Sequence, residues 1–324
     1  MCALANLSCA TGEDPAPPPV EKEEVSTPVT WAGNEDGEAL GSALAIGPDG
    51  WYAGAPGGET GRVYRGGAEG LSLVLEEEGR GALGHALALH PTLGLLAGAP
   101  LRHEAAGAIV SETGEHRSGT ENAVLGTRLR VRGEQLLALS ALGYWVDDIE
   151  WPTATRPSDI ELVGEEILLA FARGDTALVR GDWSLERPEA LDEAGFSLCL
   201  SDFDADGESD LAVGAPGSNR VYLLYGSDGW ALESATVLEG PGGRFGHALA
   251  CHRDTLVVGA PLHPGLRGAA WRFEGDPGSR SVQEPWIEGE EGDQLGFALA
   301  TNGDFVLLGA PGLATGPGKV ICAP

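Results

Sequence analysis

Basic residues are scarce in this chain of 324 residues. Lysine and arginine together number 20 against 49 aspartate and glutamate residues, which gives a formal net charge of −29 at pH 7. A surface this acidic repels phosphate backbones and anionic membranes, and it favours cations or basic partners. The composition therefore argues against nucleic acid as a partner.

Long apolar runs are also missing, since none approaches the ~18 residues of a membrane-spanning helix. The first residues, MCALANLSCA, are small and apolar, and a proline- and acid-rich stretch follows. This order is typical of the end of a secretory signal (residues 1–11) followed by a tether (residues 12–27). Cleavage after Ala5, a lipid anchor on Cys9 and a start upstream of Met1 all stay open. We expect an exported protein, extracellular or anchored in the cell envelope, with a disordered cytosolic tail as the alternative.

Cysteine is rare as well. The five cysteines form no CxxC pair and no zinc-binding spacing, and an odd count does not suit a disulfide framework. Cys199 and Cys251 lie in apolar segments, where we expect them to be small core residues.

Glycine, by contrast, is abundant, with 50 residues spread along the chain without a collagen period. Much of it belongs to a repeated unit: Leu/Phe-Gly-x-Ala-Leu-Ala, a short turn, an apolar strand ending in Gly-Ala-Pro, and an alternating strand. Clear copies occupy residues 40–56, 83–100, 195–216, 245–261 and 295–311, and weaker copies start at residue 125 and span 160–173. Periods of roughly 20–50 residues are typical of solenoids and propellers.

Each of the seven units predicts four strands, and four-stranded sheets repeated around an axis make a β-propeller. The last unit stops after its third strand, whereas Trp31–Gly41 matches Trp286–Gly296, the fourth strand and loop of unit six. Residues 28–31 therefore supply a spare strand that completes unit seven. An open solenoid would leave sheet edges exposed, so we expect an all-β, closed seven-bladed propeller over residues 28–324.

These units resemble FG-GAP repeats, which build the N-terminal seven-bladed propeller of integrin α subunits. The resemblance is strong in units 1, 2, 5, 6 and 7 and weak in units 3 and 4. With only two lysines, the chain is also typical of a GC-rich bacterial genome, which suggests an exported bacterial-type member.

The sharpest chemical motif is DFDADGESD, residues 202–210. Alternating carboxylates in a tight loop concentrate hard oxygen ligands that suit Ca²⁺. An EF-hand would need a glutamate at position 12, where this chain has Val213. The FG-GAP resemblance implies side-chain ligands from Asp202, Asp204, Asp206 and Asp210, and a backbone carbonyl from Glu208. No other unit keeps this loop, so we expect one structural calcium ion.

Other motifs point less clearly to a function. His85 and His247 occupy one repeat position, which indicates packing, and the two Arg-Gly-Asp tripeptides (173–175, 180–182) are read as turn chemistry. Nothing pairs a nucleophile with a base. The leading hypothesis is therefore an exported, calcium-binding module for cell-surface binding or adhesion. The alternatives are a propeller-scaffold enzyme of hydrolase or lyase type, and a purely structural envelope protein.

A partner, either a protein or a surface glycan, is expected on the loops between second and third strands. The longest of these are residues 101–107, 262–268 and 312–318. They present Arg102, His103, His263 and Arg267 on the face that integrin-type propellers are understood to use. The calcium loop is expected at the opposite end.

Overall fold

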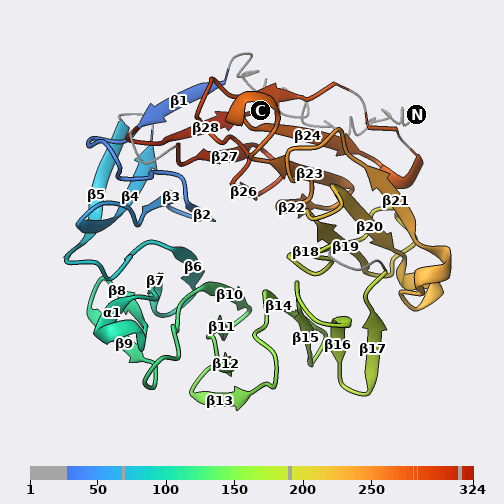
Figure 1. Ribbon diagram of the computed structural model, residues 1–324, viewed down its shortest axis with the longest axis horizontal. Helices are drawn as coiled ribbons and strands as arrows, with labels where there is room; N and C mark the ends of the chain where they lie inside the picture. Colours follow the sequence, from blue (N-terminus) through green and yellow to red (C-terminus); the bar gives the residue numbers. More distant parts are fainter. Residues whose placement is uncertain (1–27, 68–69, 189–191, 280, 283, 313–315) are drawn as a thin grey trace, which may run out of the picture.

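Seven four-stranded antiparallel sheets surround a central axis in the computed structural model of the chain (Figure 1). The structure describes residues 28–67, 70–188, 192–279, 281–282, 284–312 and 316–324. The predicted all-β seven-bladed propeller is thus confirmed. The expected signal and tether, with Ala5 and Cys9, lie outside the described residues, as does part of the 312–318 loop.

The blades follow one another along the chain, and each runs from an innermost to an outermost strand. Blade 1 comprises β2 (Ala43–Gly47), β3 (Gly50–Ala55), β4 (Thr60–Gly67) and β5 (Gly70–Glu78). Blade 2 comprises β6 (Ala86–His90), β7 (Gly94–Ala99), β8 (Ala108–Ser111) and β9 (Gly114–Ser118). Blade 3 comprises β10 (Arg128–Arg132), β11 (Gln135–Leu139), β12 (Gly143–Val146) and β13 (Ile149–Pro152). Blade 4 comprises β14 (Asp159–Val163), β15 (Glu166–Ala170), β16 (Thr176–Arg180) and β17 (Trp183–Glu186).

The remaining blades keep the same order. Blade 5 comprises β18 (Ser197–Ser201), β19 (Asp210–Ala215), β20 (Arg220–Leu224) and β21 (Thr236–Glu239). Blade 6 comprises β22 (Ala248–His252), β23 (Thr255–Ala260), β24 (Ala269–Glu274) and β25 (Ile287–Glu288). Blade 7 comprises β26 (Ala298–Thr301), β27 (Val306–Ala310), β28 (Lys319–Ala323) and β1 (Val29–Ala32). Short helical turns are α1 (Arg102–Ala105), η1 (Gly226–Asp228), η2 (Leu232–Ser234), η3 (Pro264–Leu266) and η4 (Pro277–Ser279).

The hydrophobic core lies in the seams between blades. In the seam between blades 1 and 2, for example, Tyr52 and Val63 pack with Leu95 and Ala97. The second strand of a blade has a neighbouring blade on each side, which explains why its sequence is continuously apolar.

Glycines set how closely the blades approach. A Cβ added to Gly54, in the Gly-Ala-Pro of blade 1, would lie 1.9 Å from the carbonyl oxygen of Gly84, in the Leu-Gly of blade 2. Gly84 itself has φ +91°, a conformation that L side chains rarely adopt. The Gly of Gly-Ala-Pro in one blade and the Gly of Leu-Gly in the next therefore contact each other across the seam.

The ring closes through both of these devices. β1 pairs antiparallel with β28, from Val29 opposite Cys322 to Ala32 opposite Lys319. A Cβ on Gly309 of blade 7 would lie 2.0 Å from the carbonyl oxygen of Gly41, just before blade 1. Blade 7 thus packs on blade 1 as neighbours elsewhere do, and the predicted closure is confirmed.

A disulfide links two blades, and it corrects the prediction made for its cysteines. Cys199 on β18 and Cys251 on β22 are bonded, with their Cα atoms 6.0 Å apart. The expectation of two separate core thiols was wrong. The cysteines are 52 residues apart, about one repeat, so they occupy similar positions in successive blades. That separation places them on adjacent innermost strands, a proximity that a count of cysteines does not reveal.

Blades 3 and 4, whose repeats are weak, are joined by ion pairs along their innermost strands. Arg130 Nη2 lies 3.0 Å from Asp159 Oδ2, and the side chain of Asp159 is fully buried. Two strand positions further, Arg132 Nε and Nη2 donate to Glu161 at 2.7 and 2.6 Å. Charged pairs here take the place of the small apolar side chains that the other blades place around the axis.

Candidate metal centre

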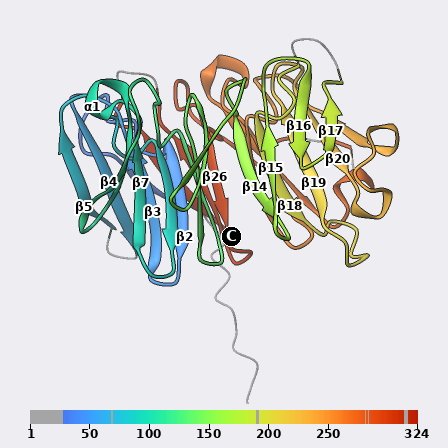
Figure 2. The same ribbon diagram turned by 90° about the horizontal axis from the view of Figure 1, so that it is seen from below.

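The acidic loop connects β18 to β19 at one end of the propeller. Loops between first and second strands, and between third and fourth strands, share this end, which we call the calcium end. Loops between second and third strands, and those joining successive blades, share the other end, which we call the α1 end because α1 lies there (Figure 2).

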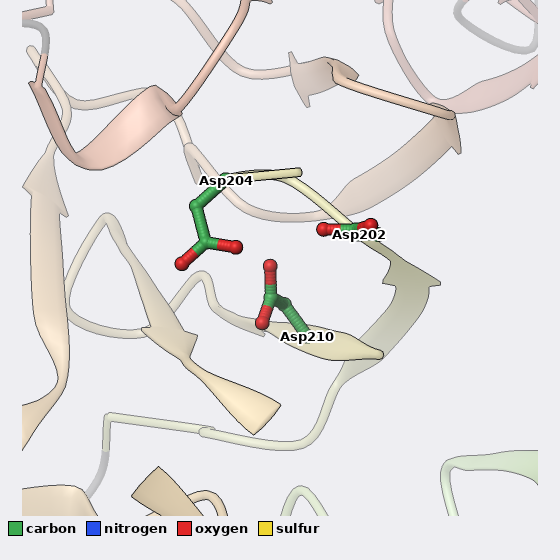
Figure 3. Close-up of side chains that lie close together, drawn as sticks. All are labelled: Asp202, Asp204 and Asp210. Carbon is green, nitrogen blue, oxygen red and sulfur yellow. The ribbon is translucent and has the colours of Figure 1, made fainter. Parts of the chain in front are cut away.

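Three carboxylates of the loop converge. One oxygen each from Asp202, Asp204 and Asp210 lies within 4.8 Å of the others, and Figure 3 shows the three side chains pointing toward one another. Asp204 is exposed, Asp202 is half-buried and Asp210 is buried. Hard oxygens around one point suit a divalent cation, and the half-open position leaves room for water ligands.

Hydrogen bonds from the backbone hold the loop in this shape. Asp202 accepts from the amides of Asp206 (3.1 Å) and Gly207 (3.0 Å), and Asp204 Oδ1 also accepts from Asp206 at 3.1 Å. The chain reverses through Ala205 and Gly207, with φ of 62° and 92°. The carboxylates are thus oriented by the turn itself.

Two of the predicted ligand residues, Asp206 and Glu208, are not part of this cluster of side-chain oxygens. Asp206 Oδ1 accepts the amide of Glu208 at 2.8 Å, and both side chains are exposed. The described geometry therefore joins three of the five predicted residues, while side-chain ligation by Asp206 and carbonyl ligation by Glu208 stay predictions.

Asp210 is the anchor of the cluster. Its oxygens accept from the amides of Phe203 (2.7 Å) and Gly226 (2.9 Å). Burial raises the pKa of Asp210, and the nearby carboxylates of Asp204 and Asp206 raise it further, against these two hydrogen bonds. A cation between the carboxylates would relieve that repulsion.

The loop after β20 supports the site from the side, which the sequence did not reveal. Besides the amide of Gly226, the buried Trp230 donates from Nε1 to the carbonyl oxygen of Ser209 at 2.8 Å. The sequence alone gives no signal for this contact, because it depends on the fold placing the loop after β20 beside the acidic loop.

The four residues predicted for the partner face lie at the α1 end, in the loops of blades 2 and 6. Arg102 Nε lies 3.0 Å from Glu77, and His103 Nε2 lies 2.8 Å from Glu115. His263 packs edge-on against Trp271, with centroids 5.2 Å apart. Arg267 is exposed. The two loops lie on blades that are not neighbours, so the structure does not gather these residues into one cluster.

Residues 194–227, which contain the acidic loop, match the FG-GAP repeat family. The chain is thus a seven-bladed β-propeller with an FG-GAP repeat, consistent with the expected similarity to integrin α propellers.

Part of the chain is also similar in sequence to curated proteins. The chain is 40% identical to human phosphatidylinositol-glycan-specific phospholipase D over 162 residues, which cover 39% of this chain and 19% of that protein. The rat protein of the same name is 40% identical over 91 residues, 21% of this chain and 11% of that protein. The chain therefore matches about a fifth or less of these relatives' length.

Solved structures support the fold alone, because their sequences are distant. A chain of the mitotic checkpoint complex superposes with a TM-score of 0.62 at 10% identity, covering 99% of each chain. A streptogramin B lyase superposes with a TM-score of 0.59 at 12% identity, covering 91% of this chain and 97% of the lyase. Among the described residues, no helix has the length and apolar character needed to cross a bilayer.

Proposed function

We propose that this propeller is an exported, calcium-binding interaction module that captures a protein partner at its α1 end. The observation that carries the proposal is the convergence of Asp202, Asp204 and Asp210 in a loop that matches an FG-GAP repeat. The propeller fold itself suits protein interaction, because loops on a rigid scaffold are where recognition usually resides.

Calcium would act as a structural ion. Asp202, Asp204 and Asp210 would hold it, and it would neutralise repulsion in a loop braced against Asp210, Gly226 and Trp230. Calorimetry tests the ion directly: the expected result is a stoichiometry near one calcium per chain, and a value near zero would remove this part of the proposal.

Export is supported by the disulfide between Cys199 and Cys251, because disulfides persist in oxidising compartments and are rare in the reducing cytosol. Mass determination of the protein isolated from its own cell, after alkylation without reductant, tests this part. Alkylation of both cysteines would contradict it.

The α1 end is proposed for docking because it exposes apolar side chains among charged ones. Leu262 and Leu266, in the blade 6 loop, are each 39% exposed, and Leu101, in the separate blade 2 loop, is 52% exposed. Exposed apolar groups beside charged ones are typical of protein interfaces. Charged Arg102 and Arg267 flank them. A protein surface with apolar and acidic groups would complement either loop.

A photo-crosslinking amino acid at position 262, compared with one at Leu93, tests the docking face. Leu93 is 41% exposed in the turn between β6 and β7, at the calcium end, so it matches Leu262 in type and exposure. Crosslinks to the same partner from position 262 alone are expected. Crosslinks from position 93 alone would place docking at the calcium end.

A second candidate, a hydrolase, has one observation in its favour, the similarity to the phospholipase D relatives. Release of a glycosylphosphatidylinositol-anchored protein from vesicles by the purified chain would support it. The match covers 39% of this chain and 19% of the human protein, so a hydrolase stays the second candidate.

A further inference from the structure

The innermost strands of all seven blades surround a channel along the axis, and its half at the α1 end holds a cavity of about 400 Å³. Every blade contributes to its wall, from Ser42–Leu44 of blade 1 to Phe297–Leu299 of blade 7. Binding cavities for small molecules occupy roughly 300–1,000 Å³, so this cavity is large enough for a small organic ligand.

One side of this cavity is cationic. Arg128 and Arg130, both on β10, line it together with Asp159, so its charged groups sum to 2 − 1 = +1. Arg128 Nε lies 3.4 Å from Asp159 Oδ1, and 36% of the Arg128 side chain is exposed. Arg130 donates from Nη2 to Asp159 at 3.0 Å and to the carbonyl oxygen of Leu198 at 3.2 Å, and 27% of its side chain is exposed. The wall therefore has donor capacity beyond what Asp159 accepts.

Another part of the wall is aromatic. Phe196, His247 and Phe297 come from blades 5, 6 and 7, and the His247 ring lies between the two phenylalanines with centroids 4.8 and 4.9 Å away. His247 Nδ1 is buried and has no hydrogen-bond partner in the described part of the chain. Phe297 is 36% exposed, so its ring remains accessible from the channel.

We propose that this cavity binds a small organic anion, with its carboxylate at Arg128 and Arg130 and its planar apolar body against Phe196, His247 and Phe297. This function goes beyond calcium binding and partner capture, and it needs neither. A positive site in a chain of net charge −29 is selective, because anions are repelled elsewhere and the channel wall screens the charge less than water does.

The other half of the channel shows why the site is confined to the α1 end. There Arg132 is satisfied by Glu161 through two hydrogen bonds of 2.7 and 2.6 Å. Its guanidinium is therefore engaged in a bidentate pair, which makes Arg132 a matched control for Arg128 on the same strand.

Three probes that share one ring test the proposal by ¹⁹F NMR: 4-fluorobenzoate, 4-fluorobenzyl alcohol and 4-fluorobenzylamine. Benzoate is expected to bind, the alcohol at least tenfold more weakly, and the amine not at all. Binding should persist in EGTA, which separates this site from the calcium loop. The proposal would be overturned by equal binding of benzoate and the alcohol, or by tighter binding of the amine. It would also be overturned if benzoate did not bind at about 10 mM, ten times a weak Kd of about 1 mM.

Variants then locate the site. Arg128→Gln should weaken benzoate at least tenfold, as expected for a lost charge-assisted hydrogen bond, while Arg132→Gln should change it less than twofold. Phe297→Leu, at an exposed position that does not endanger folding, should weaken it about threefold by removing ring contact. Melting curves confirm that each variant is folded. Unchanged affinity in both Arg128→Gln and Phe297→Leu, or equal losses in the two arginine variants, would refute the location.

Discussion

Replacing His247 by phenylalanine should remove part of the acid sensitivity of this protein. The same repeat position holds Phe196 in blade 5 and Phe297 in blade 7, and both rings already contact His247. The substitution therefore keeps an aromatic ring in its slot and changes mainly the ability to take up a proton.

The magnitude follows from the folded environment of the imidazole. Burial and, after it, the positive charges of Arg244 and Arg128 lower the pKa of His247 to about 3, against a hydrogen bond with the Phe297 backbone that raises it. In the unfolded chain a histidine has a pKa of about 6.5. The unfolded state therefore binds a proton below pH 6.5 that the folded state refuses, and stability falls as pH falls through the window from about 6.5 to 3.

At pH 5 the unfolded histidine is about 1.5 pH units below its pKa, which corresponds to a loss of about 2 kcal/mol relative to pH 8. His247→Phe should lack this loss, while the other titrating groups contribute equally to both chains. Urea unfolding at pH 8 and pH 5 measures it. At pH 8 the free energies of unfolding of the two proteins should differ only by the change in packing. On acidification to pH 5 the variant should lose about 2 kcal/mol less than the parent protein. Equal losses in both proteins would show that His247 is protonated in the fold.

Four further outcomes are expected. Cys199→Ser with Cys251→Ser should lower the free energy of unfolding by about 4 kcal/mol, the loop entropy of a 52-residue crosslink; an unchanged urea midpoint would contradict this. EGTA should lower the melting temperature of the parent protein, because calcium at 100-fold above its Kd stabilises the fold by about 2.7 kcal/mol. Asp204→Asn should abolish this effect of EGTA, whereas Asp254→Asn, in the exposed blade 6 turn, should leave it intact. Deleting residues 1–27 should barely change the melting temperature, whereas deleting residues 1–33 should expose the edge of β28 and cause aggregation; equal melting temperatures would argue against closure by β1. Arg102→Glu with Arg267→Glu should weaken capture of the partner, and Arg253→Glu, at the calcium end, should not; the reverse pattern would assign the docking face to the calcium end.

The fold was predictable because its decisive contact is written into each repeat. Gly54 and Gly84 meet across a seam, and the sequence repeats their Leu-Gly and Gly-Ala-Pro settings in most blades. The spare strand near Trp31 could be matched to its counterpart near Trp286 for the same reason. The structure places the strand at Val29–Ala32, one residue later than the predicted 28–31.

What escaped prediction depends on which blades are neighbours rather than on the repeat. Cys199 and Cys251 pair because innermost strands of successive blades lie side by side. The pairs of Arg130 with Asp159 and of Arg132 with Glu161 cross another such seam, in the two units where the repeat is weakest. Even at the predicted calcium loop, the support from Trp230 comes from a residue 21 positions away in sequence, roughly half a repeat period.

The antiparallel pairing of β1 with β28 also fixes how the ring would carry mechanical load. Val29 lies opposite Cys322, near the end of β28 that faces the calcium end, and Ala32 lies opposite Lys319. A pull applied ahead of Val29, away from the ring along the strand, would load all four residue pairs in shear instead of peeling them one at a time. The packing of Trp31 against Trp51, with centroids 4.9 Å apart, would resist the same sliding motion, so the strand that closes the propeller is also oriented to bear tension.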